Sequence, residues 1–143
     1  MQEVIAASGI SKKFEAAQAL KDISFEVNEG EIFGFIGPYG AGKTTLFRII
    51  ATLLLPDEGR IEVIGLDAIE GFKELRKNIG YMPGRFSLYQ DLTVEENLNF
   101  YATVFGTSVK ANYDLIADIY SHIEPFKKRL AGKLLLHSSR KLA

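Results

Sequence analysis

The stretch Gly37-Pro38-Tyr39-Gly40-Ala41-Gly42-Lys43-Thr44-Thr45 decides the fold of this chain. Its outer glycines, Gly37 and Gly42, are separated by four residues, and lysine and threonine follow them, which is the pattern of a phosphate-binding loop. The apolar segment 32–36 before the loop is predicted to be a buried strand, and the segment 45–50 after it is predicted to be helical. This strand, loop and helix order is the context in which the pattern binds phosphate, so a chance glycine-rich turn is disfavoured.

The residue types fit a crowded set of negative oxygens. Glycine permits positive φ and lets backbone N–H groups approach an anion closely, and the helix start near Gly42 adds the positive end of its dipole. Lys43 is predicted to place its ammonium on the β and γ phosphates of a nucleotide, and Thr44 to offer its hydroxyl to Mg²⁺. Thr45 is predicted to bind a phosphate nearer the sugar. The motif therefore predicts ATP and Mg²⁺ as ligands.

Composition narrows the remaining classes. The chain has 143 residues, of which 47% are hydrophobic, and a net charge of −1 that gives no general attraction to nucleic acid. The basic run 127–129 is interpreted as a solvated face, because no set of stacking aromatics accompanies it. There is no cysteine, which excludes disulfides and thiolate chemistry. No secretory signal is visible at the start, and the apolar stretch 49–55 is too short to span a bilayer.

Periodicity predicts strands in the first half of the chain and helices in the second. The predicted strands are 4–11, 20–27, 32–36, 60–64 and 79–82. The predicted helices are 42–53, largely buried; 72–77; one that starts at Thr93 with a capping box to Glu96 and ends at Gly106; and 112–123, with Leu115, Ile116, Ile119 and Ile123 on one side and Pro125 at its end. We expect residues 1–89 to form a β subdomain with part of the phosphate-loop core, and residues 90–143 to form part of a helical subdomain.

The order of these pieces resembles the nucleotide-binding domain of ATP-binding cassette (ABC) transporters, most closely the exporter type. Besides the loop, the similarity rests on the segments 20–32, 55–59, 79–83 and 91–98, which occur in the family's order and spacing. The resemblance implies an α/β fold with a phosphate-loop NTPase core, an N-terminal antiparallel β subdomain and the start of a helical subdomain, in which the sheet is incomplete. The weaker alternative, a non-transport cassette protein of DNA repair or translation, is disfavoured by the segment 81–106.

The resemblance also implies functional residues and partners. The nucleotide site is expected to comprise Phe14, Gly37, Pro38, Tyr39, Gly40, Ala41, Gly42, Lys43, Thr44 and Thr45. Phe14 would stack on adenine; the other interpretation is a core aromatic of the first hairpin. Phe86, Leu88 and Tyr89 are expected either to receive a helix of a transmembrane permease or to pack as an ordinary loop. A second nucleotide-binding domain would complete a dimer at the cytoplasmic face of the inner or plasma membrane, which the chain reaches through its partner.

The chain departs from the family pattern at three places. Tyr39 stands where the family has Asn or Asp, and Gly84 stands where it has a glutamine that ligates Mg²⁺. The segment 135–139 replaces the serine-glycine-glycine signature. The acidic catalytic residues of the family are expected beyond Ala143, so no catalytic residue is assigned within the chain.

Two functional interpretations follow. In the first, the chain is part of the ATP-hydrolysing subunit of an exporter and does not hydrolyse ATP alone. In the second, it is a module that binds nucleotide or a partner without hydrolysis. The strand 32–36 would have unpaired apolar edges in either case, so we expect the isolated chain to be marginally stable or oligomeric.

Overall fold

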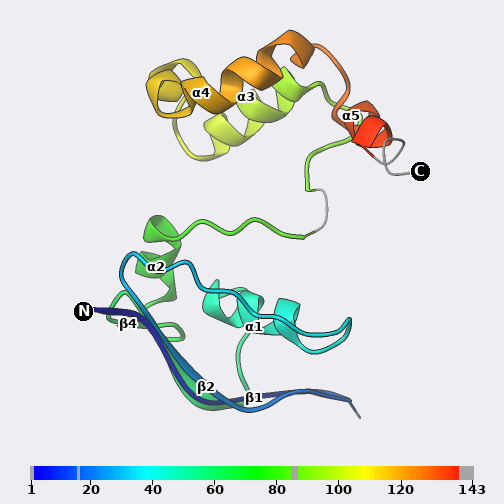
Figure 1. The fold of residues 1–143 in the computed structure, drawn as a ribbon. Coiled ribbons are helices and arrows are strands. Elements are labelled where there is room, and N and C mark those ends of the chain that lie inside the picture. The colour runs from blue at the N-terminus through cyan, green and yellow to red at the C-terminus, as the bar shows by residue number, and fades with distance from the viewer. Residues whose placement is uncertain (1, 16, 85–86, 139–143) are drawn as a thin grey trace. The chain divides into compact units, whose positions relative to one another are not determined.

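The computed structural model describes residues 2–15, 17–84 and 87–138 (Figure 1). Contacts between Cα atoms divide the chain into two compact units, residues 1–82 and 83–143. The predicted boundary after residue 89 concerns the functional division of the chain and stays a prediction.

An antiparallel sheet forms the frame of the first unit. Its four strands are β1 (Glu3–Phe14), β2 (Ala17–Asn28), β3 (Glu58–Val63) and β4 (Leu66–Asp67), in the order β2-β1-β3-β4. The strands predicted at 4–11, 20–27 and 60–64 are confirmed, and β1 and β2 extend further because they pair along most of their length. The central position of β1 gives it neighbours on both edges, so the hairpin and β3 are joined into one sheet.

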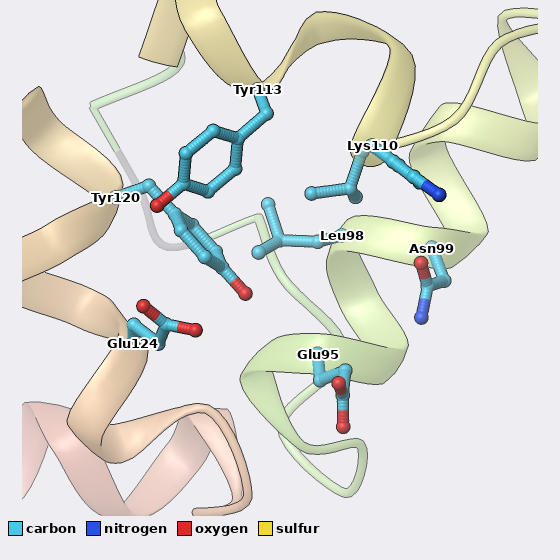
Figure 2. Close-up of a pocket in the computed structure, with 8 residues that line it drawn as sticks. Glu95, Leu98, Asn99, Lys110, Tyr113, Tyr120 and Glu124 are labelled. Carbon is cyan, nitrogen blue, oxygen red and sulfur yellow. The ribbon is translucent and has the colours of Figure 1, made fainter. Parts of the chain in front are cut away.

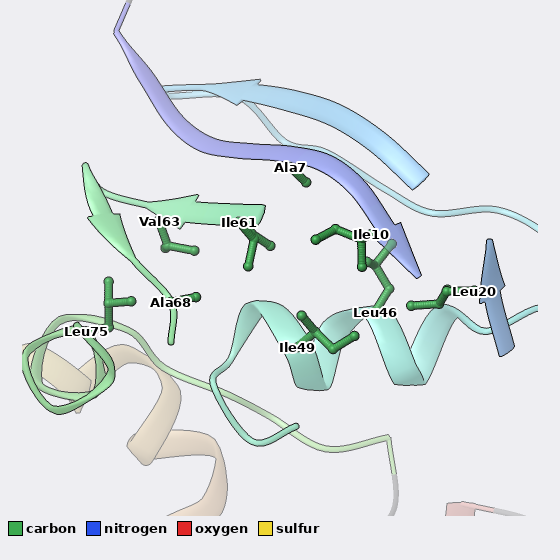
Figure 3. Packing of buried hydrophobic residues seen from close by; sticks show 9 residues of the cluster. All are labelled: Ala7, Ile10, Leu20, Leu46, Ile49, Ile61, Val63, Ala68 and Leu75. Atoms are coloured by element: carbon green, nitrogen blue, oxygen red, sulfur yellow. The ribbon is translucent and has the colours of Figure 1, made fainter. Parts of the chain in front are cut away.

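Two helices cover the apolar residues of this sheet. Helix α1 (Lys43–Ile50) places Leu46 and Ile49 against Ile10 and Ile61, and α2 (Phe72–Asn78) adds Leu75 to the same cluster (Figure 3). Burying a side chain of this size contributes about 1.5–3 kcal/mol, so this contact fixes α1, and the loop before it, on the sheet.

The helix predicted over 42–53 is present, but it is shorter and less buried than predicted. Helix α1 ends at Ile50, and Thr52 has a positive φ of 60° that a continuing helix cannot adopt. Phe47 and Leu53 are exposed, because only the face that carries Leu46 and Ile49 meets the sheet. The apolar side chains on the other faces of α1 are therefore not covered by any of the described residues.

The strands predicted at 32–36 and 79–82 were also wrong: neither segment is a strand. A parallel strand needs hydrogen-bonded neighbours, and within the described residues none pairs with either segment. Ile32 and Ile36 are fully exposed. The segment is held instead by aromatic contacts, in which the ring of Phe35 lies 5.0 Å from that of Phe25 and 5.3 Å from that of Phe47.

The second unit is helical. It contains α3 (Val94–Val104), the 3₁₀ turn η1 (Lys110–Asn112), α4 (Tyr113–Ile123), the 3₁₀ turn η2 (Glu124–Phe126) and α5 (Ala131–Ser138), the last of which was not predicted. The capping box is confirmed: the Glu96 N–H donates to Thr93 Oγ1 at 3.2 Å, and the Thr93 N–H donates to Glu96 Oε2 at 2.7 Å. None of the helices described is long and apolar enough to cross a membrane.

The packed face of α4 differs from the predicted one. Leu115 is exposed, whereas Tyr120 is buried, so the face is rotated toward the tyrosine. Ile116, Ile119 and Ile123 line an apolar cavity of about 340 Å³ between α3, α4 and the start of α5. Pro125 lies in η2 directly after α4, as predicted for the end of this helix.

Candidate phosphate-binding site

The loop 37–42 turns directly into α1, and two of its glycines have left-handed backbone. Gly40 has φ 84°, and Gly42, the N-cap of α1, has φ 82°. A Cβ on Gly42 would lie 2.3 Å from the carbonyl oxygen of Ala19 and 2.8 Å from Leu20 Cδ2, whereas one on Gly40 would meet nothing within 4 Å. Gly42 is therefore required by its conformation and by the close approach of β2, while Gly40 is required by its conformation alone.

Lys43 folds back over the loop. Its Nζ donates hydrogen bonds to the carbonyl oxygens of Gly37 at 2.7 Å and Pro38 at 2.6 Å. An ammonium has three donors, so within the described part of the chain one remains for an anionic ligand. The positive charge of Lys43 thus lies next to the start of the loop, at Gly37 and Pro38.

The start of α1 adds backbone donors. The first hydrogen bond that its N–H groups make within the helix runs from Leu46 to the carbonyl oxygen of Gly42, at 2.9 Å. The N–H groups of Lys43, Thr44 and Thr45 precede it and belong to the first turn, which has no intrahelical acceptors. No side chain caps this end and no acidic residue lies in its first turn, so its partial positive charge is not neutralised locally.

Three further side chains of this segment were predicted to belong to the site: Tyr39, Thr44 and Thr45. Tyr39 is fully exposed, and its backbone alone belongs to the turn, so the ring does not fill the cradle. Thr44 is exposed and Thr45 is half-buried at the start of α1. Among the described residues no three His, Cys, Asp or Glu side chains cluster as a metal site. Metal binding by Thr44 stays a prediction.

Phe14 ends β1 and is 45% exposed, which argues against the alternative of a core aromatic. The Nζ of Lys12 lies 5.7 Å from the centre of its ring and also makes a 2.6 Å ion pair with Asp57. One ring thus combines an exposed surface with a nearby cation. Adenine stacking on Phe14 stays a prediction.

The residues predicted to meet a membrane partner lie in the second unit. Leu88 is half-buried and Tyr89 is exposed, and Phe86 falls outside the described residues. Gly84 is exposed, and a Cβ built on it meets nothing within 4 Å. The segment 135–138, which replaces the family signature, belongs to α5, and Ser139 is outside the described residues.

Sequence reasoning missed Asn97, a buried polar residue that shapes the loop before α3. It is 1% exposed, and its side chain accepts from the Tyr89 N–H at 2.8 Å and donates to the Tyr89 carbonyl at 2.9 Å. It also donates to the carbonyl oxygen of Thr93 at 2.9 Å. The only signal in the sequence was a polar residue three positions after the buried Val94.

Comparison with known proteins gives matches in one family. Residues 20–139 match the family model described as ABC transporter. The chain is 42% identical over 135 residues to the probable multidrug ABC transporter ATP-binding protein YbhF of Escherichia coli (strain K12), which covers 92% of this chain and 23% of YbhF.

Two solved structures share the fold. One is described as the ATP-binding subunit of an ABC transporter (TM-score 0.70, 30% identity, covering 89% of this chain and 54% of that one). The other is a dimeric ATP-binding cassette in a post-hydrolysis state with ADP and Pi (TM-score 0.72, 22% identity, covering 89% and 61%). The chain therefore spans about a quarter of YbhF and a little over half of the solved chains.

The matched family model covers most of the chain, and the solved structure of an ABC transporter ATP-binding subunit shares its fold. The chain therefore belongs to the ABC transporter family, and its fold is that of the family's ATP-binding domains.

Proposed function

We propose that this chain binds ATP with Mg²⁺ through residues 37–45 and serves as the nucleotide-binding part of an ABC exporter. The observation that carries the proposal is the loop itself. Its left-handed glycines bend the backbone into the start of α1, and the Lys43 ammonium lies across it on two carbonyl oxygens. Such an arrangement suits a triphosphate, because backbone N–H groups, a helix N-terminus and a cation converge on one place.

The roles of individual residues follow from their chemistry. Lys43 would exchange its loop carbonyls for the β and γ phosphate oxygens, which are stronger acceptors because they are charged. The Thr44 hydroxyl would ligate Mg²⁺, an ion that prefers oxygen ligands, and Thr45 would bind a phosphate nearer the sugar. Phe14 would offer its exposed ring to adenine.

Hydrolysis needs more than the loop provides. Phosphoryl transfer to water requires a group that orients the water, and the loop 37–45 contains no carboxylate, imidazole or amide side chain. Gly84 has no side chain to ligate the metal. We therefore propose that the isolated chain binds nucleotide without steady turnover, and that hydrolysis belongs to the assembled transporter.

The partners proposed are a transmembrane permease and a second nucleotide-binding domain. YbhF is named a probable multidrug ABC transporter ATP-binding protein, which supports the exporter assignment, and the dimeric cassette with ADP and Pi supports pairing. The chain would then work at the cytoplasmic face of the membrane, held there by the permease.

Binding of a fluorescent ATP analogue tests the proposal. Lys43→Ala should weaken binding roughly tenfold or more, because a charge-assisted hydrogen bond contributes about 1.5–3 kcal/mol. Lys77→Ala, which removes an exposed lysine of α2, is the matched control and should change nothing. Equal affinity of Lys43→Ala and the native chain would contradict the role of the loop. If the native chain releases phosphate from ATP and Lys43→Ala does not, the proposal that the isolated chain lacks steady turnover is contradicted.

A further inference from the structure

A cavity of about 320 Å³ in the second unit lies outside the phosphate loop (Figure 2). Residues of α3, η1, α4 and η2 surround it, and the polar and aromatic ones are Glu95, Asn99, Lys110, Tyr113, Tyr120 and Glu124. The two acidic residues come from opposite sides of the cavity wall, one from α3 and one from η2. The aromatic residues both come from α4, two turns apart.

The wall that carries the carboxylates is held by backbone hydrogen bonds. The N–H of Glu95 donates to the carbonyl oxygen of Lys127 at 2.9 Å, and the N–H of Val94 donates to that of Arg129 at 3.0 Å. These carbonyls satisfy donors at the start of α3 that have no acceptor within the helix. The chain after η2 is thereby fixed across the start of α3, the helix that carries Glu95.

Tyr120 points to a ligand. Tyr120 is 9% exposed, and none of the hydrogen bonds among the described residues involves its hydroxyl. No fully buried polar side-chain atom of the described part lacks a partner, so the hydroxyl is reachable from the cavity. Figure 2 shows this oxygen directed into the cavity, on the side of Glu95.

The neighbouring groups set the charge that a ligand would need. The ring of Tyr113 packs edge-on against that of Tyr120, with 5.8 Å between their centres. The Lys127 ammonium lies 3.3 Å from Glu124 Oε1, and the hydrogen bond and charge of Glu124 raise the pKa of Lys127, with smaller contributions from Tyr120 and Glu95. In Figure 2 the ammonium of Lys110 points away from the rings. This end of the cavity therefore stabilises positive charge.

We propose that this cavity binds a small organic cation, an alkylammonium group, with its charge near the carboxylates of Glu95 and Glu124 and its carbon chain on the tyrosine rings. Carboxylates accept charge-assisted hydrogen bonds from such groups, and aromatic faces attract them. A volume near 320 Å³ is at the lower end of small-molecule sites. The source of the group is either a free amine or a lysine side chain of a peptide.

Ring-labelled tyrosine NMR of the full chain tests the proposal, because the chain has six tyrosines and no tryptophan. Butylammonium chloride should shift the signals of Tyr113 and Tyr120 saturably, and 1-pentanol, a neutral alcohol one carbon longer, should not. The peptide acetyl-Gly-Lys-Gly-amide is the second probe, and the tighter of the two probes identifies the source. If neither probe gives saturable shifts beyond those of equal sodium chloride, or if pentanol gives the same shifts, the proposal is overturned.

Variants separate binding from a structural role of the same residues. The double variant Glu95→Gln/Glu124→Gln should weaken butylammonium binding at least fivefold. Lys127→Met should strengthen binding about threefold, because it removes the internal cation that competes for Glu124. Asp118→Asn, an exposed carboxylate of α4 outside the cavity, is the control and should leave binding unchanged. Unchanged signals of the other four tyrosines verify the fold, and weaker binding by Lys127→Met would refute the charge assignment.

Discussion

Replacing Gly42 with alanine isolates the contact between the phosphate loop and β2. The alanine would have to adopt the φ of 82° found at this position. Its Cβ would lie 2.3 Å from the carbonyl oxygen of Ala19, which belongs to a paired strand and cannot move freely. The left-handed conformation costs about 1–2 kcal/mol in a non-glycine residue, and an extra methyl group in a tight space costs about 1–3 kcal/mol. We expect a loss in unfolding free energy of roughly 2–5 kcal/mol, against a typical total of about 5–15 kcal/mol.

Urea unfolding followed by circular dichroism measures this loss. With a slope of about 1.5 kcal/mol per molar urea, the midpoint should fall by roughly 1–3 M. Gly40→Ala is the matched control, because its φ of 84° is similar but a Cβ there meets nothing within 4 Å. It should cost only the conformational part, about 1–2 kcal/mol. Equal losses in the two variants would refute the close approach of Gly42 to β2.

Three further predictions concern other residues. Gly84→Gln should change the unfolding free energy by less than about 0.5 kcal/mol, because a Cβ at this position meets nothing within 4 Å; a larger loss in urea would show a hidden contact. Thr93→Ala should cost about 0.5–2 kcal/mol through loss of the capping box, and an unchanged thermal midpoint would contradict this. Finally, hydrogen bonds lower the pKa values of three carboxyl groups. The Lys12 side chain donates to Asp57, and the backbone N–H groups of Glu70 and Ile69 donate to Asp67. Thr93 donates to Glu96. Their stabilising contribution is complete above the unfolded-state pKa values and is lost as the pH falls through the lower folded-state values, so thermal midpoints should be flat above about pH 5 and fall below about pH 4. A midpoint that holds down to pH 3 would contradict it.

Local chemistry was the part of this fold that could be predicted from sequence. The capping box of Thr93 and Glu96 depends on four consecutive residues, and it formed as predicted. The hairpin of β1 and β2 also formed, because both partners lie close together in the chain. The turn at Gly42 follows the same rule, since the motif prescribes a glycine where the backbone is left-handed.

Predictions that depended on distant partners failed. The segment 32–36 has strand-like composition, but a strand forms only where a neighbour offers hydrogen bonds, and the described residues offer it none. The packed face of α4 was misjudged because Tyr120 carries a polar group and was not counted among the buried residues. Asn97 was missed for a similar reason: its burial is compensated by loop carbonyls that periodicity does not reveal.

Exposed apolar residues of the segment 32–36 bear on the expectation that the isolated chain is marginally stable or oligomeric. Ile32 and Ile36 are fully exposed. Exposed apolar surface of this kind favours association. The expectation itself stays a prediction, which light scattering and calorimetry on the isolated chain can examine.

The central claim is that the phosphate groups, held by the loop 37–45, supply the affinity for nucleotide. One competition titration tests it most directly: ATP, ADP and AMP, each with Mg²⁺, against a fluorescent ATP analogue on the native chain. We expect ATP and ADP to compete at least tenfold better than AMP, because Lys43 and the start of α1 act on phosphates beyond the first. If AMP competes as well as ATP, the loop is not the binding site.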